Sequence, residues 1–125
     1  MKITMLGTGN ATVTECYNTC FVLSGKGKHL LVDGGGGNTV LRRLKQAGTD
    51  WKDIRDIFVT HKHIDHLLGI IWMARMICQN MSRGTYDGEA RIYAHDEVIA
   101  LIDDMARRLL GAKESAFIGK RLHLI

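Results

Sequence analysis

Three histidines and an aspartate fall within six positions, directly after an apolar run, and this cluster constrains the chain more than any other feature. The run is "DIFVT", residues 56–60, and the cluster holds His61, His63, Asp65 and His66. A short apolar run of this kind predicts a buried β-strand. Imidazole nitrogens and carboxylate oxygens are ligands that zinc prefers in proteins. The sequence therefore predicts a metal site at the carboxyl end of a buried strand, where open α/β sheets keep their sites.

The rest of the chain alternates strand-like and helix-like segments. Strands are predicted at residues 2–6, 19–24, 29–33, 56–60, 90–94 and 121–125. Helices are predicted from Asn38, as a plausible N-cap, to Gly48, over residues 67–79 and over residues 96–110. The second and third strands form a predicted hairpin across "GKGK". This order predicts an α/β sheet with helices packed against it, in a single domain spanning residues 1–125.

Two glycine-rich stretches resemble nucleotide-binding loops, but each lacks a feature that such loops need. In "GTGNAT", residues 7–12, the third glycine of the dinucleotide fingerprint is Thr12, and the segment that follows does not predict a helix to meet a pyrophosphate. "GGGGNT", residues 34–39, has no phosphate-binding lysine. We interpret the first stretch as a turn and the second as a tight strand-to-helix connection near the histidine cluster. No cofactor site other than the metal site is predicted.

Composition and cysteine usage restrict the partners and the compartment. The chain has 17 basic and 13 acidic residues, and this net charge of +4 permits attraction to phosphates without the clustering of a nucleic-acid-binding face. Cys16, Cys20 and Cys78 have no zinc-finger spacing and are interpreted as reduced thiols. No signal-peptide pattern is present, and the most apolar segment, residues 67–77, is too short to span a bilayer. We therefore predict a cytoplasmic protein with no membrane partner.

The motif "THKHIDH", residues 60–66, resembles the T-H-x-H-x-D-H signature of the metallo-β-lactamase superfamily. The opening "MKITMLGTGNA", Asn18 and the "LLVDGGGG" turn resemble the ribonuclease Z and phosphodiesterase branch of that superfamily. The resemblance covers roughly residues 1–110. It implies an α/β fold that corresponds to the N-terminal half of an αββα sandwich, a mixed sheet with helices on one face. It also implies one or two zinc ions, with manganese or iron as alternatives.

The same resemblance implies roles for individual residues. His61 and His63 would hold a first metal ion, and Asp65 and His66 a second one. Asp65 would also accept a proton during catalysis. Asp33 would support the metal-binding loop without binding the metal itself. The implied activity is hydrolysis of a phosphodiester, in RNA or a nucleotide, by metal-bound hydroxide. Two alternatives stay open: a non-catalytic fragment or subunit that keeps part of the metal site, and a thioester hydrolase or lactonase on the same scaffold.

In the superfamily, the second half of the sandwich supplies the remaining ligands, and we expect this chain to be truncated before that half. His95 and His123 do not match the missing ligands, so they are interpreted, with His29, as structural or solvent-facing. Half a sandwich leaves one apolar sheet face uncovered. We therefore expect a homo-oligomer or a partner that covers this face, and weak retention of metal.

Overall fold

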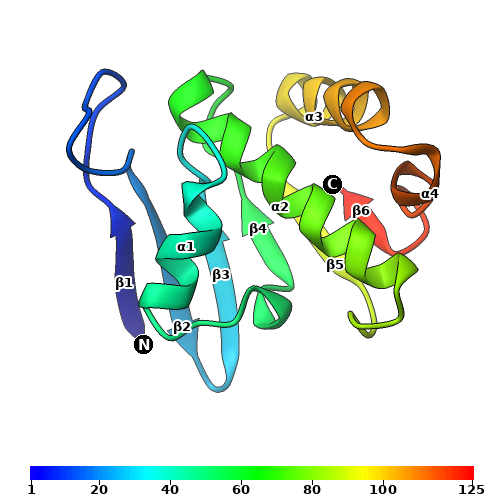
Figure 1. Cartoon of the computed structure of the whole chain (residues 1–125), viewed down its shortest axis with the longest axis horizontal. Coiled ribbons are helices and arrows are strands. Elements are labelled where there is room, and N and C mark those ends of the chain that lie inside the picture. The colour runs from blue at the N-terminus through cyan, green and yellow to red at the C-terminus, as the bar shows by residue number, and fades with distance from the viewer.

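A six-stranded mixed sheet is the frame on which the other elements are placed (Figure 1). The computed structural model describes residues 1–125. The strands follow one another across the sheet in chain order: β1 (Lys2–Gly7), β2 (Cys20–Gly25), β3 (Lys28–Val32), β4 (Asp56–Phe58), β5 (Ala90–Tyr93) and β6 (Leu122–Leu124). The first three strands pair antiparallel, and β3 to β6 pair parallel. The prediction of an α/β fold with a mixed sheet is confirmed.

The helices pack on one side of this sheet. They are α1 (Thr39–Gln46), the short 3-10 helix η1 (Trp51–Asp53), α2 (Ile64–Ser82), α3 (Asp96–Leu109) and α4 (Ala112–Ser115). In Figure 1, α1 and α2 cross in front of the strands, and α3 and α4 lie toward the β5–β6 end. Alternate strand residues, among them Val22, Leu31, Ile57 and Ile92, are fully buried and join the helices in one hydrophobic core. None of the helices combines the length and hydropathy that crossing a membrane requires.

The second predicted helix begins earlier than its apolar pattern indicates. The pattern predicts a start at residue 67, whereas α2 begins at Ile64, so Asp65 and His66 lie in its first turn. The first turn carries the exposed Ile64 and the half-buried polar residues Asp65 and His66 instead of core residues, and hydrophobic periodicity does not detect such a turn. A carboxylate in the first turn also interacts favourably with the helix dipole. The site residues are therefore held by regular backbone rather than by a loop alone.

Three other local features can be compared with the prediction. Asn38 is the N-cap residue of α1, as predicted, but its side chain makes no capping hydrogen bond. The helices η1 and α4 contain only three and four residues, which is too short for a helical period to be recognised. After β1 the chain returns directly to β2, so "GTGNAT" precedes no helix and the interpretation of this stretch as a turn holds.

The sheet face that points away from the helices is largely apolar. Strand register places five side chains in one row across β1 to β5: Met5, Phe21, Val32, Phe58 and Tyr93. Met5 and Phe58 are 49% and 43% exposed, in contrast to the fully buried strand residues under the helices. A contiguous apolar patch of this kind marks an interaction surface in soluble proteins.

We propose that this apolar row drives self-association of the 125-residue chain. Threonine at positions 5 and 58 preserves strand propensity while it removes apolar area. The double variant Met5→Thr/Phe58→Thr is therefore expected to shift sedimentation equilibrium toward the monomer. Leu109→Thr is the matched control, because Leu109 is 67% exposed but lies on α3, away from the row. A wild-type chain that sediments as a monomer throughout the micromolar range contradicts the proposal.

Candidate metal centre

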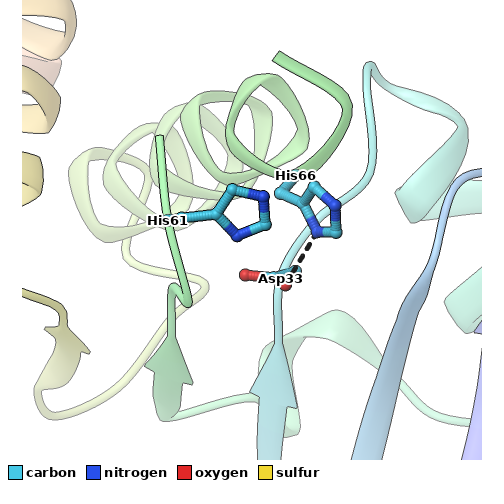
Figure 2. Close-up of side chains that lie close together, drawn as sticks. All are labelled: Asp33, His61 and His66. Carbon is cyan, nitrogen blue, oxygen red and sulfur yellow. Dashed lines mark hydrogen bonds and ion pairs between the residues drawn. The ribbon is translucent and has the colours of Figure 1, made fainter. Parts of the chain in front are cut away.

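Asp33, His61 and His66 meet at the edge of the sheet where β3 and β4 end (Figure 2). Asp33 directly follows β3, the loop after β4 carries His61 and His63, and the first turn of α2 supplies Asp65 and His66. Because β3 and β4 run parallel, their carboxyl ends lie at the same edge. Figure 2 shows His61 and His66 on either side of the Asp33 carboxylate.

Asp33 is a buried carboxylate whose two oxygens accept three hydrogen bonds. Its side chain belongs to a residue only 4% exposed, with a backbone φ of 60°, in the left-handed region that aspartate tolerates better than most residues. Oδ1 accepts from the Thr60 backbone N–H at 2.8 Å. Oδ2 accepts from the Thr60 hydroxyl at 2.7 Å and from His66 Nδ1 at 2.9 Å. Asp33 therefore joins the end of β3 to both the loop after β4 and the start of α2.

These hydrogen bonds also determine which nitrogen of each ring carries a proton. An ionised carboxylate only accepts hydrogen bonds, so His66 presents Nδ1–H to Asp33, and its Nε2 remains for other partners. The Thr60 hydroxyl gives its one proton to Asp33 and lies 2.7 Å from His61 Nδ1, so it accepts from that nitrogen. The same carboxylate thus sets the protonation of His66 directly and that of His61 through Thr60.

The three histidine rings lie close to one another. The ring centre of His61 lies 4.6 Å from that of His63 and 4.2 Å from that of His66. One potential ligand atom from each of Asp33, His61 and His66 lies within 4.8 Å of the other two. Asp65 contacts one member of this group, because its Oδ2 lies 3.2 Å from His66 Nε2. The tightest group therefore contains two of the four predicted ligands, His61 and His66, together with Asp33. His63 and Asp65 each lie next to one member of that group.

The chemistry of these donors fits a divalent cation. His66 Nε2 and Asp65 Oδ2 are 3.2 Å apart, and two acceptor atoms at this distance need a proton or a cation between them. Imidazole nitrogens with a carboxylate oxygen suit zinc and, less selectively, manganese or iron. Asp33 has both of its oxygens occupied by hydrogen bonds, so it is better placed to orient the rings than to bind the cation itself.

Sequence reasoning missed Thr60 as a functional residue, although it opens the quoted motif. Its hydroxyl matters only because Asp33, which lies 27 positions away in the chain, stands beside it.

The three isolated histidines have ordinary structural roles, as interpreted from sequence. His29 bonds to Ser24, His95 accepts from the Glu97 N–H at the start of α3, and His123 bonds to Glu89.

The three cysteines are free, and two of them lie in the core. Cys20 and Cys78 are fully buried, whereas Cys16 is exposed. Burial raises the pKa of the Cys20 thiol to about 12, and the neighbouring Asp33 carboxylate acts in the same direction. Burial likewise raises the pKa of the Cys78 thiol to about 12. Both buried thiols therefore keep their protons near neutral pH and are not thiolate nucleophiles.

Comparison with known proteins identifies relatives of this chain by sequence and by fold. The chain is 42% identical over 73 residues to a ribonuclease Z of Salinibacter ruber (strain DSM 13855 / M31), which covers 56% of this chain and 22% of that protein. The crystal structure of human tRNase Z, short form, superposes with a TM-score of 0.71 at 25% identity, covering 89% of this chain and 40% of that one. The metallo-β-lactamase fold protein YhfI from Bacillus subtilis has a TM-score of 0.69 at 19% identity, covering 98% and 45%.

These matches confirm the resemblance to the metallo-β-lactamase superfamily and to its ribonuclease Z branch. The chain spans about a quarter of the length of the curated relatives it matches. A family model described as Anti-Pycsar protein Apyc1 matches residues 1–114. Because this match extends over most of the 125 residues, the chain belongs to the Apyc1 family of Anti-Pycsar proteins, and its fold is the metallo-β-lactamase fold.

Proposed function

We propose that this chain supplies the N-terminal metal ligands of a divalent-cation-dependent phosphodiesterase that hydrolyses cyclic nucleotides. The observation that carries the proposal is the arrangement around His66. Asp33 occupies its Nδ1, and Nε2 is left facing Asp65 Oδ2 at 3.2 Å. Cyclic nucleotides are proposed as substrates because the matching family model is that of Apyc1, which hydrolyses them.

In this proposal, His61, His63, Asp65 and His66 hold the cation, with zinc as the first choice and manganese or iron as alternatives. The bound cation would supply Lewis acidity and would lower the pKa of water nearby. Asp65 would accept a proton from the attacking water, because its carboxylate is already directed into the cluster by His66. Asp33 and Thr60 would hold the rings in the required orientation and protonation.

Charge near the cluster supports an anionic substrate. Lys62 is exposed between the two loop histidines, and the chain has a net charge of +4. Both features favour the approach of a phosphate to the cluster. We further propose a cytoplasmic location, because the three cysteines are free and two of them are buried, as is usual in a reducing compartment.

RNA is the second candidate substrate. The observation that favours it is the 42% identity to a ribonuclease Z over a segment that covers 56% of this chain. A cyclic nucleotide and an RNA both present a phosphodiester, so the same cluster would serve either substrate. The two candidates differ in the size of the group that must be accommodated beside the cluster.

The proposal is tested by metal analysis and hydrolysis assays on the purified chain. Because weak retention of metal is expected, the assays contain excess zinc or manganese. Under these conditions the metal is expected to bind stoichiometrically and to support hydrolysis of bis-p-nitrophenyl phosphate and of 3′,5′-cyclic nucleotides more readily than of RNA. Faster hydrolysis of RNA would favour the second candidate. A thioester and a lactone belong in the same panel, since turnover of either without phosphodiester cleavage would overturn the proposed substrate class.

Asp65→Ala is expected to lower metal-dependent kcat/KM at least tenfold, because the variant loses a ligand and a proton acceptor. Asp103→Ala is the matched control, since Asp103 pairs only with Arg107 on the surface of α3. Stoichiometric metal without turnover of any substrate would favour a non-catalytic subunit. A chain that binds no divalent cation would overturn the proposed function altogether.

A further inference from the structure

The glycine stretch Gly34–Gly37 is wrapped around the hydroxyl of Tyr17, a residue from the long loop between β1 and β2. The Tyr17 hydroxyl lies 2.5 Å from the Gly34 carbonyl oxygen and 2.8 Å from the Gly37 carbonyl oxygen. It also accepts from the Gly37 N–H at 3.2 Å. Its single proton is shared between the two carbonyls. Tyr17 itself is only 8% exposed, so these backbone groups have little access to water as an alternative partner.

The aromatic ring of Tyr17 also leaves no room for a side chain at position 35. Gly35 has a φ of 70°, and a Cβ atom on it would stand 2.3 Å from the ring. Asn18, the next residue, adds a second attachment, because its Oδ1 accepts from the Gly36 N–H at 3.1 Å. The Asn18 side chain is fixed in turn by donating to the Asn10 carbonyl at 2.8 Å. Two neighbouring side chains therefore hold the whole glycine stretch from one side.

The other side of the glycine stretch is bonded to the helix that carries the site. The Gly34 N–H donates to the His66 carbonyl at 3.0 Å, and the Gly69 N–H donates to the Gly35 carbonyl at 2.9 Å. Asp33 is the residue immediately before Gly34. The glycine stretch therefore couples the backbone of Asp33 to the first turns of α2.

We propose that Tyr17, assisted by Asn18, is a positioning residue that holds the glycine stretch so that Asp33 and His66 keep the separation and orientation of the cation site. This inference rests on the proposed function only in so far as the cluster binds a cation. Phenylalanine would fill the same space, so the hydroxyl is the part of the side chain that the proposal concerns. Burial raises the pKa of Tyr17 to about 12, so the hydroxyl keeps its proton and remains a donor near neutral pH.

The structure offers a matched control for removing this hydroxyl. Tyr86 is 1% exposed, and its hydroxyl donates to the Ile54 carbonyl at 2.9 Å, in the core and away from the glycine stretch. Tyr17→Phe and Tyr86→Phe each delete one buried hydroxyl that bonds to backbone. A merely structural role for Tyr17 predicts similar behaviour of the two variants, whereas the proposal predicts that only one of them disturbs the site.

The experiment compares amide hydrogen exchange and zinc affinity in both variants and in the wild-type chain. In Tyr17→Phe, the Gly34 and Gly69 amides are expected to exchange at least tenfold faster, and zinc affinity is expected to fall by about 10- to 100-fold. In Tyr86→Phe, both quantities should match the wild type. Wild-type exchange and affinity in Tyr17→Phe would overturn the inference.

A second variant covers the case in which Tyr17→Phe does not fold. Asn18→Ala removes the acceptor of the Gly36 N–H and leaves Tyr17 in place, so faster exchange at Gly36 with several-fold weaker zinc binding is expected. Unchanged zinc affinity together with faster exchange at Gly36 would overturn the link between the glycine stretch and the site. If no variant and no wild-type chain binds zinc, the proposed function fails, while exchange at Gly34 and Gly69 still decides whether Tyr17 holds the glycine stretch.

Discussion

Replacing Asp33 with asparagine is expected to weaken the binding of divalent cations by about 100-fold while the chain keeps its fold. Asparagine has the shape of aspartate and tolerates the left-handed backbone at this position, where φ is 60°. The loss therefore comes from hydrogen bonding rather than from backbone strain. Three donor groups point at the native carboxylate: two from Thr60 and one from His66.

The amide group of asparagine cannot accept from all three donors. If its NH2 group takes the place of Oδ2, it faces His66 Nδ1, and the ring must move its proton to Nε2. That nitrogen would then carry a hydrogen toward Asp65 and would no longer offer a lone pair to a cation. If the amide is turned over, its NH2 group meets the Thr60 N–H, and two donors oppose each other. Either arrangement disturbs the cluster, at a cost in unfolding free energy of about 2 kcal/mol.

Titration calorimetry with zinc, together with circular dichroism of the same samples, measures this effect. Asp56→Asn is the matched control, because Asp56 begins β4 at the opposite end of the strand and has only a long, partly exposed contact of 3.9 Å with Arg91. Its zinc affinity should equal that of the wild type. A folded Asp33→Asn chain with unchanged affinity would show that the carboxylate does not set the protonation of the histidines.

Gly69→Ala is expected to destabilise the fold by about 3 kcal/mol, although the same change in an exposed helix interior stabilises by about 1 kcal/mol. Gly69 lies within α2, where alanine has the higher helix propensity. An added Cβ atom, however, would stand 1.8 Å from the carbonyl oxygen of Gly34 and 2.4 Å from its carbonyl carbon. These are backbone atoms that cannot rotate away, so α2 must separate from the glycine stretch.

Urea denaturation followed by circular dichroism gives the difference in unfolding free energy directly. Gly37→Ala is the matched control, since a Cβ atom at position 37 would have no neighbour within 4 Å. It is expected to leave stability within about 0.5 kcal/mol of the wild type. A Gly69→Ala chain that is as stable as the wild type would mean that α2 and the glycine stretch do not pack as closely as described.

Much of the strand and helix pattern could be predicted, because burial alternates with a period that the sequence displays. The predicted strand at residues 56–60 ends at Phe58 in the structure, and the helix predicted from residue 67 begins at Ile64. Both differences concern residues next to the cluster. At Val59 and Thr60 burial still alternates although β4 has ended, whereas residues 64–66 open α2 without any buried residue, so hydrophobic periodicity does not detect that turn. The glycines of residues 34–37 were interpreted correctly as a tight approach to the histidine loop, but the sequence did not indicate that Gly69 is the surface they approach.

The sequence by itself identified the donor groups of the candidate site, because His61, His63, Asp65 and His66 are neighbours in the chain at a strand exit and a helix start. Only the tertiary structure decided how these side chains are held. Asp33 reaches the cluster, and Tyr17 reaches the adjacent glycine stretch, through hydrogen bonds that link residues 17 to 33 positions apart. Such contacts depend on the register of β3 against β4 and on the packing of α2 over the sheet, which local sequence patterns do not specify.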